Sequence, residues 1–186
     1  MVKVDRVVTR GGDGGETSLG DGTRVRKDAA RIAAIGAIDE ANAAIGVLRA
    51  ELGAETWADA LLARIQNDLF DLGADICVPG EAGDRLRVAD TQCARLEAEL
   101  AEMNARLAPL TSFVLPGGTR AAAFAHVART AARRAERAVV RLVAEEAVNA
   151  AAIRYLNRLS DHLFVLSRAL NGWGAGDVLW TPGATR

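Results

Sequence analysis

The sequence has few of the residues that build metal centres or covalent cross-links. Cys77 and Cys93 are its only cysteines, and His126 and His162 are its only histidines. The cysteines lack metal-site spacing and two cannot define a disulfide framework, so we expect a reduced, cytoplasmic protein. No Glu-x-x-His, His-Glu-x-x-His, Cys-x-x-Cys or Gly-x-Ser-x-Gly motif is present. These absences argue against di-iron chemistry, zinc catalysis and a serine nucleophile on a sharp elbow.

Prolines, aromatic side chains and long apolar runs are also scarce. The chain has four prolines, and aromatic residues make up 4% of it. No uncharged apolar stretch is long enough to cross a membrane, and the start, Met1–Asp5, has no basic segment followed by an apolar run. We therefore expect no membrane span and no signal peptide. A net charge of −1 makes duplex nucleic acid an unsuitable partner, so any anion site must be a local concentration of charge.

Alanine and helical periodicity are abundant. With 186 residues, half of them hydrophobic, the chain suits one domain with a full-sized core. Apolar side chains recur at helical spacing in five segments, 29–52, 56–77, 90–108, 119–147 and 149–171. The pattern predicts an all-α, ferritin-like five-helix up-down bundle at 29–172, preceded by an arm at 1–28 and followed by a tail at 173–186. We expect Asp90 and Thr91 to cap the third helix, and Trp173 and Trp180 to anchor the tail.

The arm combines glycines with hydroxyl groups and positive charge. Valines between Val2 and Val8 predict a short extended segment, and six of the fourteen residues in Thr9–Gly22 are glycine. Backbone amides in such runs can converge on an anion. Hydroxyls and cations that could assist are Thr9, Thr17, Ser18, Arg10, Arg24, Arg26 and Lys27. The stretch is not a Walker A loop, and composition alone leaves a flexible terminal arm equally open.

The fourth helical segment carries a stripe of charge. Arg129, Arg133, Glu136 and Arg137 fall within an arc of roughly 100°, and Arg134 lies further round. Guanidinium groups on one stripe suit a triphosphate, because each presents a planar fork of donors to phosphate oxygens. Apolar residues cluster on the opposite side, namely Phe124, Ala131, Ala135, Ala138 and Leu142. An ordinary solvated helix face is the commoner explanation of such a stripe taken alone.

Several other polar or aromatic residues have both a structural and a functional interpretation. Asp39 interrupts the first helical segment, and Asn157 and Asp161 project together from the fifth, one turn apart. Each fits an ordinary helix flank as well as a site. Phe113, next to a Pro-Gly-Gly turn, fits a plug at the end of the bundle. A lone helical histidine such as His162 is more often structural than catalytic.

Three separated stretches together resemble the PduO-type ATP:cob(I)alamin adenosyltransferases. They are Thr9–Leu19 with Arg24–Asp28, Arg129–Arg137, and Tyr155–Phe164. Between them, Ile38–Asn42, Ile65–Gly73 and Phe113–Gly118 look like the same family. Any one motif is weak, but their joint order and spacing, from Val4 to Trp180, are specific.

The resemblance implies a bundle that assembles as a homotrimer with active sites between subunits. It implies transfer of the 5′-deoxyadenosyl group from ATP to the cobalt of cob(I)alamin, which forms adenosylcobalamin and releases triphosphate. Mg²⁺ would accompany ATP, through ligands that the sequence does not identify. A reductant would supply cob(I)alamin, and an adenosylcobalamin-dependent mutase is a candidate recipient of the product.

The resemblance also assigns residues to roles. The family's ATP-wrapping loop matches Thr9, Arg10, Gly11, Gly12, Thr17, Ser18 and Lys27. Its helix-borne nucleotide positions match Arg133, Arg134, Glu136 and Arg137, and Asn157 matches a further ATP contact. Arg129 and Asp39 match a pair that bridges subunits beside the site. Asp161 matches a polar position near the corrin, and Phe113 an aromatic that faces the lower side of the corrin and excludes the axial base. Arg133, Phe113, Arg129, Asp39 and Asp161 are thus the residues expected to act in catalysis.

The arm departs from the family pattern at two positions. The loop commonly reads Thr-Arg-Thr-Gly-Asp-Asp-Gly, whereas Gly11 and Gly14 here replace the second threonine and the second aspartate. One hydroxyl and one carboxylate are missing, and we expect retained activity with weaker ATP binding. The departure also motivates an alternative, a non-catalytic cobalamin-delivery module or ATP-responsive binding protein.

Overall fold

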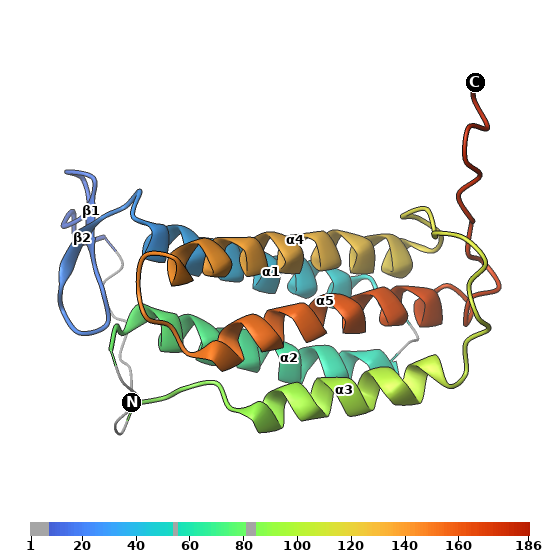
Figure 1. Cartoon of the computed structure of the whole chain (residues 1–186), viewed down its shortest axis with the longest axis horizontal. Coiled ribbons are helices and arrows are strands. Elements are labelled where there is room, and N and C mark those ends of the chain that lie inside the picture. Colours follow the sequence, from blue (N-terminus) through green and yellow to red (C-terminus); the bar gives the residue numbers. More distant parts are fainter. Residues whose placement is uncertain (1–7, 54–55, 81–84) are drawn as a thin grey trace.

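The computed structural model describes residues 8–53, 56–80 and 85–186. These residues form five helices and one hairpin: α1 (Ala30–Ala50), α2 (Thr56–Cys77), α3 (Asp90–Asn104), α4 (Arg120–Val143), α5 (Ala150–Leu170), and strands β1 (Glu16–Ser18) and β2 (Arg24–Arg26). Successive helices alternate in direction, which confirms the all-α up-down bundle (Figure 1). Apart from Val8, the extended segment expected at Val2–Val8 lies outside the described residues.

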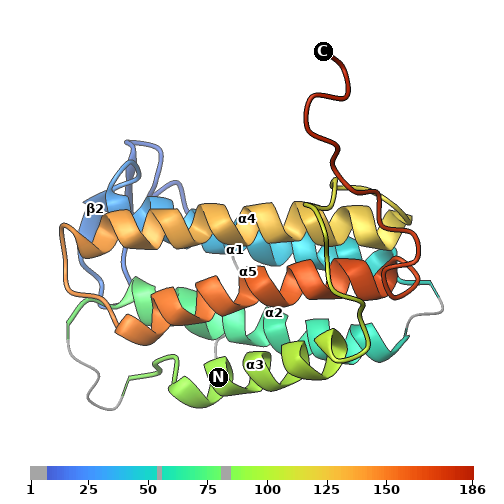
Figure 2. The ribbon, with the colours of Figure 1, turned by 45° about the vertical axis from the view of Figure 1, so that its right-hand side comes forward.

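Small side chains line the contact between α1 and α4. α1 packs against α4 and α2, and α5 packs against α4 and α3 (Figure 2). Ala34 and Ala41 on α1, and Ala125 and Ala132 on α4, are fully buried. Alanines at such positions let helix axes approach closely, because no long side chain separates them. Since α4 contributes mainly alanines to the core, its long charged side chains lie on the other side of the helix.

A buried polar cluster joins α5 to α2 and α3. The Tyr155 hydroxyl donates to Asp68 Oδ2 at 2.7 Å, and Arg95 pairs with the same carboxylate. Burial, together with Asp68, raises the pKa of Tyr155 well above its ordinary value. His162 is fully buried and lies 3.1 Å from Glu99 Oε2, as expected of a structural histidine.

Two helices end four residues earlier than predicted, and the expected cap of α3 is wrong. α3 ends at Asn104 rather than 108 and α4 at Val143 rather than 147, because the chain continues from each in tighter i→i+3 turns. At the start of α3, Gln92 accepts from the amide of Ala89 at 2.8 Å, and Asp90 pairs instead with Arg154 of α5 at 2.6 Å. A longer side chain reaching back from inside the helix replaces the predicted Asp-Thr cap.

The arm contains a hairpin that the sequence did not predict. β1 and β2 are antiparallel, with Thr17 opposite Val25. Leu19, in the connecting turn, is buried, and the amide of Gly20 donates to the carbonyl of Cys77 at 3.0 Å. The hairpin therefore rests on the C-terminal end of α2, at one end of the bundle (Figure 1).

The tail leaves the bundle at the opposite end (Figures 1 and 2). Trp173 stacks on Trp57 with ring centroids 5.6 Å apart, and the Arg106 guanidinium lies 3.3 Å from the centroid of Trp173. Further along, Leu179 forms a β-bridge with Val114. The prediction that Trp173 anchors the tail is thereby confirmed. No helix among the described residues is both long and apolar enough to cross a membrane.

Candidate functional site

The arm folds into a loop whose cationic side chains lie against its own glycines. The Arg24 guanidinium donates to the carbonyl of Gly11 at 2.8 Å, and the amide of Lys27 donates to the carbonyl of Gly15 at 2.9 Å. A Cβ at Gly12 would lie only 2.9 Å from Lys27 Nζ, so the ammonium group rests on the Gly12 backbone. The loop thus holds two cationic side chains, Arg24 and Lys27, against a glycine-rich turn, and Glu16 offsets part of the Arg24 charge at 3.6 Å. The positive charge that remains at Lys27 favours an anion.

The other predicted arm residues flank this loop. Arg10 adopts a left-handed conformation, with φ of 61°, which is uncommon for a non-glycine residue and turns the chain sharply. Ser18 accepts from Arg24 Nη1 at 3.3 Å, and Thr17 is half-buried in β1. Thr9 is exposed, with its hydroxyl 3.8 Å from where a Cβ at Gly11 would lie. Thr9 and Ser18 therefore present their hydroxyl groups at exposed positions of the arm, whereas Thr17 is half-buried.

The α4 stripe carries positive charge that the rest of the described structure does not neutralise. Arg133 and Arg137 are exposed, and within the described residues neither makes an ion pair or hydrogen bond. Arg134 is instead paired with Glu40 of α1. The apolar side of the helix is confirmed, since Ala131, Ala135 and Leu142 are buried, with Phe124 and Ala138 partly buried. Two uncompensated guanidinium groups one turn apart form a surface suited to an anion.

Glu136 contacts α5 rather than the arginines around it. Asn157 Nδ2 donates to Glu136 Oε1 at 3.0 Å. This bond fixes the side-chain amide of Asn157 beside the α4 stripe, and the side-chain Oδ1 of Asn157 has no hydrogen-bond donor among the described residues. The predicted helix-borne residues of α4 and α5 are therefore brought together.

Arg129 and Asp39 are not partners within one chain. Arg129 is half-buried with its Nε lacking an acceptor, and burial followed by the charge of Arg133 lowers the pKa of its guanidinium. Asp39 is exposed on α1, where it lines a largely apolar pocket of about 380 Å³ with Phe70 and Asn42. Each group thus lacks a counter-charge among the residues that the structure describes.

Phe113 lies on an exposed edge rather than plugging the bundle. Its side chain is 77% exposed, and its carbonyl accepts from the amide of Trp180 at 2.7 Å. The rings of Phe113 and Trp180 are 6.1 Å apart between centroids. The interpretation of Phe113 as a core plug is therefore wrong, because strand-like pairing with the tail turns its ring outward.

Asp161 lines a second pocket, between α3 and α5. The pocket has a volume of about 400 Å³ and is also lined by Phe164 and Leu100. Asp161 accepts from Arg158 at 2.9 Å, and Arg158 also binds Glu97 of α3 at 2.9 Å. A pocket with an apolar wall and a carboxylate at its rim can hold a large, partly polar ring system.

The single chain thus divides the predicted residues among five places. These are the arm, the α4 stripe with Asn157, the α1 pocket with Asp39, the exposed Phe113 ring beside the tail, and the Asp161 pocket between α3 and α5. No hydrogen bond or ion pair of the described residues joins the arm to α4. Arg24 and Glu40 are the contributors that sequence reasoning placed least well, since their contacts to Gly11 and Arg134 depend on the folded hairpin and on helix packing.

The described residues hold no preformed metal centre. No group of three or more histidine, cysteine, aspartate or glutamate side chains lies together there. A hard cation such as Mg²⁺ can be bound largely by phosphate oxygens and water, with few protein ligands. The donor set on this chain fits a cation that arrives on a triphosphate and does not fit a permanent protein-bound metal.

Comparison with known proteins gives one consistent match. A family model described as Cobalamin adenosyltransferase matches residues 7–170. A protein named Cobalamin adenosyltransferase from Cupriavidus metallidurans is 51% identical over 179 residues, which cover 96% of this chain and 95% of the relative. Corrinoid adenosyltransferase from Mycobacterium tuberculosis is 47% identical over 190 aligned positions, covering 100% of this chain and 97% of that protein.

A solved structure supports the same match in three dimensions. It is a variant PduO-type ATP:corrinoid adenosyltransferase from Lactobacillus reuteri, complexed with cobalamin and ATP. It superposes with a TM-score of 0.89 at 32% sequence identity, covering 94% of this chain and 99% of that chain. The likeness extends over the bundle and the hairpin.

Proposed function

The chain belongs to the cobalamin adenosyltransferase family, and we propose that it transfers the 5′-deoxyadenosyl group of ATP to the cobalt of cob(I)alamin. The products are adenosylcobalamin and triphosphate. The observation that carries the proposal on this chain is the uncompensated pair Arg133 and Arg137 beside Asn157. A bound triphosphate would supply the charge that these guanidinium groups lack.

The chemistry requires positioning rather than a protein nucleophile. Co(I) itself attacks C5′ of ATP, the C5′–O bond breaks, and the electron pair leaves with triphosphate. The protein must therefore hold C5′ in line with cobalt and favour negative charge on the leaving group. We assign the phosphates to Arg133, Arg134, Arg137 and Lys27, with amides of Gly11 and Gly12 and hydroxyls of Thr9, Thr17 and Ser18. Arg10, Glu136 and Asn157 complete the ATP contacts.

A second copy of the chain would complete the site. Among the described residues, no hydrogen bond or ion pair joins the arm to the α4 stripe, and Arg129 and Asp39 each lack a counter-charge. We assign Arg129 of one subunit to Asp39 of the next in a homotrimer, with ATP held between subunits. Three equivalent interfaces of this head-to-tail kind close a ring.

The corrinoid would lie against Phe113 and Asp161. The exposed Phe113 ring can occupy the place of the lower axial ligand, and Asp161 lines a pocket with an apolar wall. Loss of the axial ligand leaves cobalt four-coordinate and easier to reduce. A separate reductant would supply the electron that converts cob(II)alamin to cob(I)alamin. Mg²⁺ would arrive bound to the phosphates and offset their charge.

The test is direct. Purified protein is mixed with ATP, Mg²⁺ and chemically reduced cobalamin, and the visible spectrum is followed for formation of the cobalt–carbon bond. Failure to form that bond would refute the proposed enzymatic activity. Tight cobalamin binding without turnover would favour the binding-protein alternative, which the glycines at 11 and 14 motivate. Absence of ATP binding by calorimetry would leave only a scaffold.

A further inference from the structure

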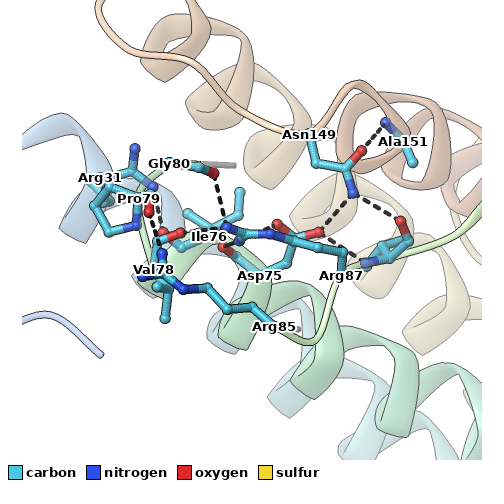
Figure 3. Close-up of polar contacts among 11 residues, drawn as sticks. Arg31, Asp75, Ile76, Val78, Pro79, Gly80, Arg85, Arg87, Asn149 and Ala151 are labelled. Carbon is cyan, nitrogen blue, oxygen red and sulfur yellow. Dashed lines mark hydrogen bonds and ion pairs between the residues drawn. The ribbon is translucent and has the colours of Figure 1, made fainter. Parts of the chain in front are cut away.

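The C-terminal end of α2 is held by side chains that come from distant parts of the chain. Carbonyl groups in the last turn of a helix have no partner within the helix. Here the carbonyl of Ile76 accepts from Arg31 Nη1 at 2.5 Å, and Arg87 Nη2 donates to the carbonyls of Val78 and Gly80 at 3.0 and 2.9 Å (Figure 3). Positive side chains at this end also interact favourably with the negative end of the helix dipole. Between these arginine-bound carbonyls, that of Cys77 is the one that receives the arm.

The arm is seated on that carbonyl with little tolerance. The amide of Gly20 donates to Cys77 O at 3.0 Å, and a Cβ at Gly20 would lie 2.7 Å from Val78 Cγ2. Real Cβ atoms do not approach so closely, so any side chain at Gly20 would displace the turn or Val78. Leu19, 7% exposed, adds an apolar contact at the same place. The position of α2's last residues therefore determines where the hairpin lies.

Arg31 links this seat to the start of α1 and to the loop between α4 and α5. It is 3% exposed and lies four residues after Lys27, in the first turn of α1. Besides Ile76 O, its Nε and Nη2 donate to Glu146 Oε2 at 3.0 and 2.6 Å, in the loop between α4 and α5. One guanidinium thus joins the start of α1, the last turn of α2 on which the arm is seated, and the loop between α4 and α5. A lysine could not make all three bonds, because its ammonium is a single point on a flexible stem.

The same cluster fixes the start of α5. Asp75 is 2% exposed and accepts from Arg87 Nη1, the amide of Val88 and Asn149 Nδ2, each at 2.8 Å (Figure 3). Asn149 in turn accepts from the amide of Ala151 at 3.0 Å and so caps α5, the helix that carries Asn157. A pocket of about 480 Å³ lies among these groups, lined by Arg31, Asp75, Arg87 and Asn149. The C-terminal end of α2 therefore contacts both the arm, through Cys77, and the start of α5, through Asp75 and Asn149.

We infer that Arg31 is a positioning residue for ATP, acting through Cys77 and Gly20 to hold the arm relative to α4 and α5. The inference rests on the proposed function, since it presumes that the arm binds ATP. Arg31 touches neither substrate. Its loss should weaken ATP binding selectively, because the corrinoid surfaces at Phe113 and Asp161 are not linked to this cluster by any hydrogen bond or ion pair of the described residues.

The experiment compares Arg31→Lys with Arg168→Lys. Arg168 is a matched control, 6% exposed, whose guanidinium also binds a carboxylate, Asp177 at 2.7 Å, and a carbonyl, Ala108 at 2.9 Å. It lies at the C-terminal end of α5, away from the arm. For Arg31→Lys we expect the KM for ATP to rise about ten-fold, with kcat at saturating ATP and the KM for cobalamin within about two-fold of wild type. For Arg168→Lys the KM for ATP should stay at the wild-type value.

A second readout needs no turnover. Trypsin can cleave the arm at its exposed basic residues. The cleavage rate without ATP therefore reports how often the arm detaches from the C-terminal end of α2. Cleavage should be faster in Arg31→Lys and in Gly20→Ala, and unchanged in Arg168→Lys. The double variant should show no larger rise in the KM for ATP than either single variant, since both act through one contact.

The outcomes separate this inference from the proposed function. If wild type neither binds ATP nor forms the cobalt–carbon bond, the proposed function fails, and the trypsin comparison still reports the coupling. If wild type is active and Arg31→Lys keeps the wild-type KM for ATP, the inference is overturned. It is overturned equally if Arg168→Lys raises that KM as much, because the effect would then be a general loss of stability.

Discussion

Arg133 is the residue whose replacement should affect chemistry most directly. It is exposed, unpaired within the described residues and on the same stripe as Arg137. We expect Arg133→Ala to lower kcat by at least about 10²-fold, because a preorganised charge facing the leaving triphosphate is removed. Single-turnover absorbance kinetics would measure it. Arg141→Ala is the control, since that arginine is on α4 but pairs only with Glu145, and equal kinetics for wild type and a folded Arg133→Ala would refute the role.

Phe113 should act on the corrinoid and not on the nucleotide. Its ring is 77% exposed on the loop before α4. We expect Phe113→Ala to reduce formation of four-coordinate, base-off cob(II)alamin strongly, with little change in the dissociation constant of ATP, because the group that fills the lower axial position is lost. Visible and electron paramagnetic resonance spectra would show this. Leu110→Ala removes a similar exposed apolar group from the same loop, and indistinguishable spectra for wild type and Phe113→Ala would disprove the assignment.

His126 should make stability depend on pH. It is buried, and burial followed by the charge of Arg129 lowers its pKa below the ordinary value of about 6.5. A depressed histidine pKa means that the unfolded chain binds a proton more readily than the folded one. The free energy of unfolding from this group is therefore highest above about pH 6.5, falls as pH decreases through that value, and levels off below the folded-state pKa.

Urea unfolding between pH 7.5 and 5 would measure this dependence. We expect His126→Gln to reduce the slope of unfolding free energy against pH in that window relative to wild type. An identical slope in both proteins would show that His126 does not contribute.

At the scale of elements, the arm is the part whose sequence departs from the family pattern. Its geometry has room for the threonine and aspartate side chains that the family carries at positions 11 and 14. A Cβ at Gly11 would have no neighbour nearer than Thr9 Oγ1 at 3.8 Å, and one at Gly14 would have none within 4 Å. We expect the double variant Gly11→Thr and Gly14→Asp to lower the KM for ATP several-fold, because it returns a hydroxyl donor and a carboxylate to the loop. Initial rates at fixed Mg²⁺ would measure it, with Gly14→Asn in place of Gly14→Asp separating the charge from the added bulk. A KM that is unchanged or higher would show that the loop binds through its backbone alone.

For the whole molecule, the unpaired charges of Arg129 and Asp39 predict the assembly. We expect wild type to sediment as a species of three 19.6 kDa chains. Asp39→Arg should dissociate it by placing like charges together, and the doubly reversed Asp39→Arg, Arg129→Asp should restore it. Analytical ultracentrifugation would test both. A monomeric wild type, or a stable trimer of Asp39→Arg, would rule out the pairing.

The sequence determined the fold class, and the spacing of apolar residues was sufficient for it. Five helical segments, each with one apolar face, can bury those faces against one another in a bundle. This conclusion does not depend on the hairpin register or on the exact helix ends. The joint motifs also determined the family. They could not predict the hairpin, because Glu16–Ser18 and Arg24–Arg26 are strands of 3 residues in which only the central residue is half-buried, too short for a recognisable alternation.

The tertiary structure decided which charges are neutralised and which surfaces are coupled. Arg134 is paired and Arg133 is not, although both lie in one charged run, because only helix packing brings Glu40 to one of them. Phe113 faces outward because the tail pairs with its backbone from more than sixty residues away. Arg31 looked like an ordinary residue of a helix start, yet its bonds to Ile76 and Glu146 span 45 and 115 residues. Such contacts depend on how helices lie against one another, and local sequence patterns carry no information about that geometry.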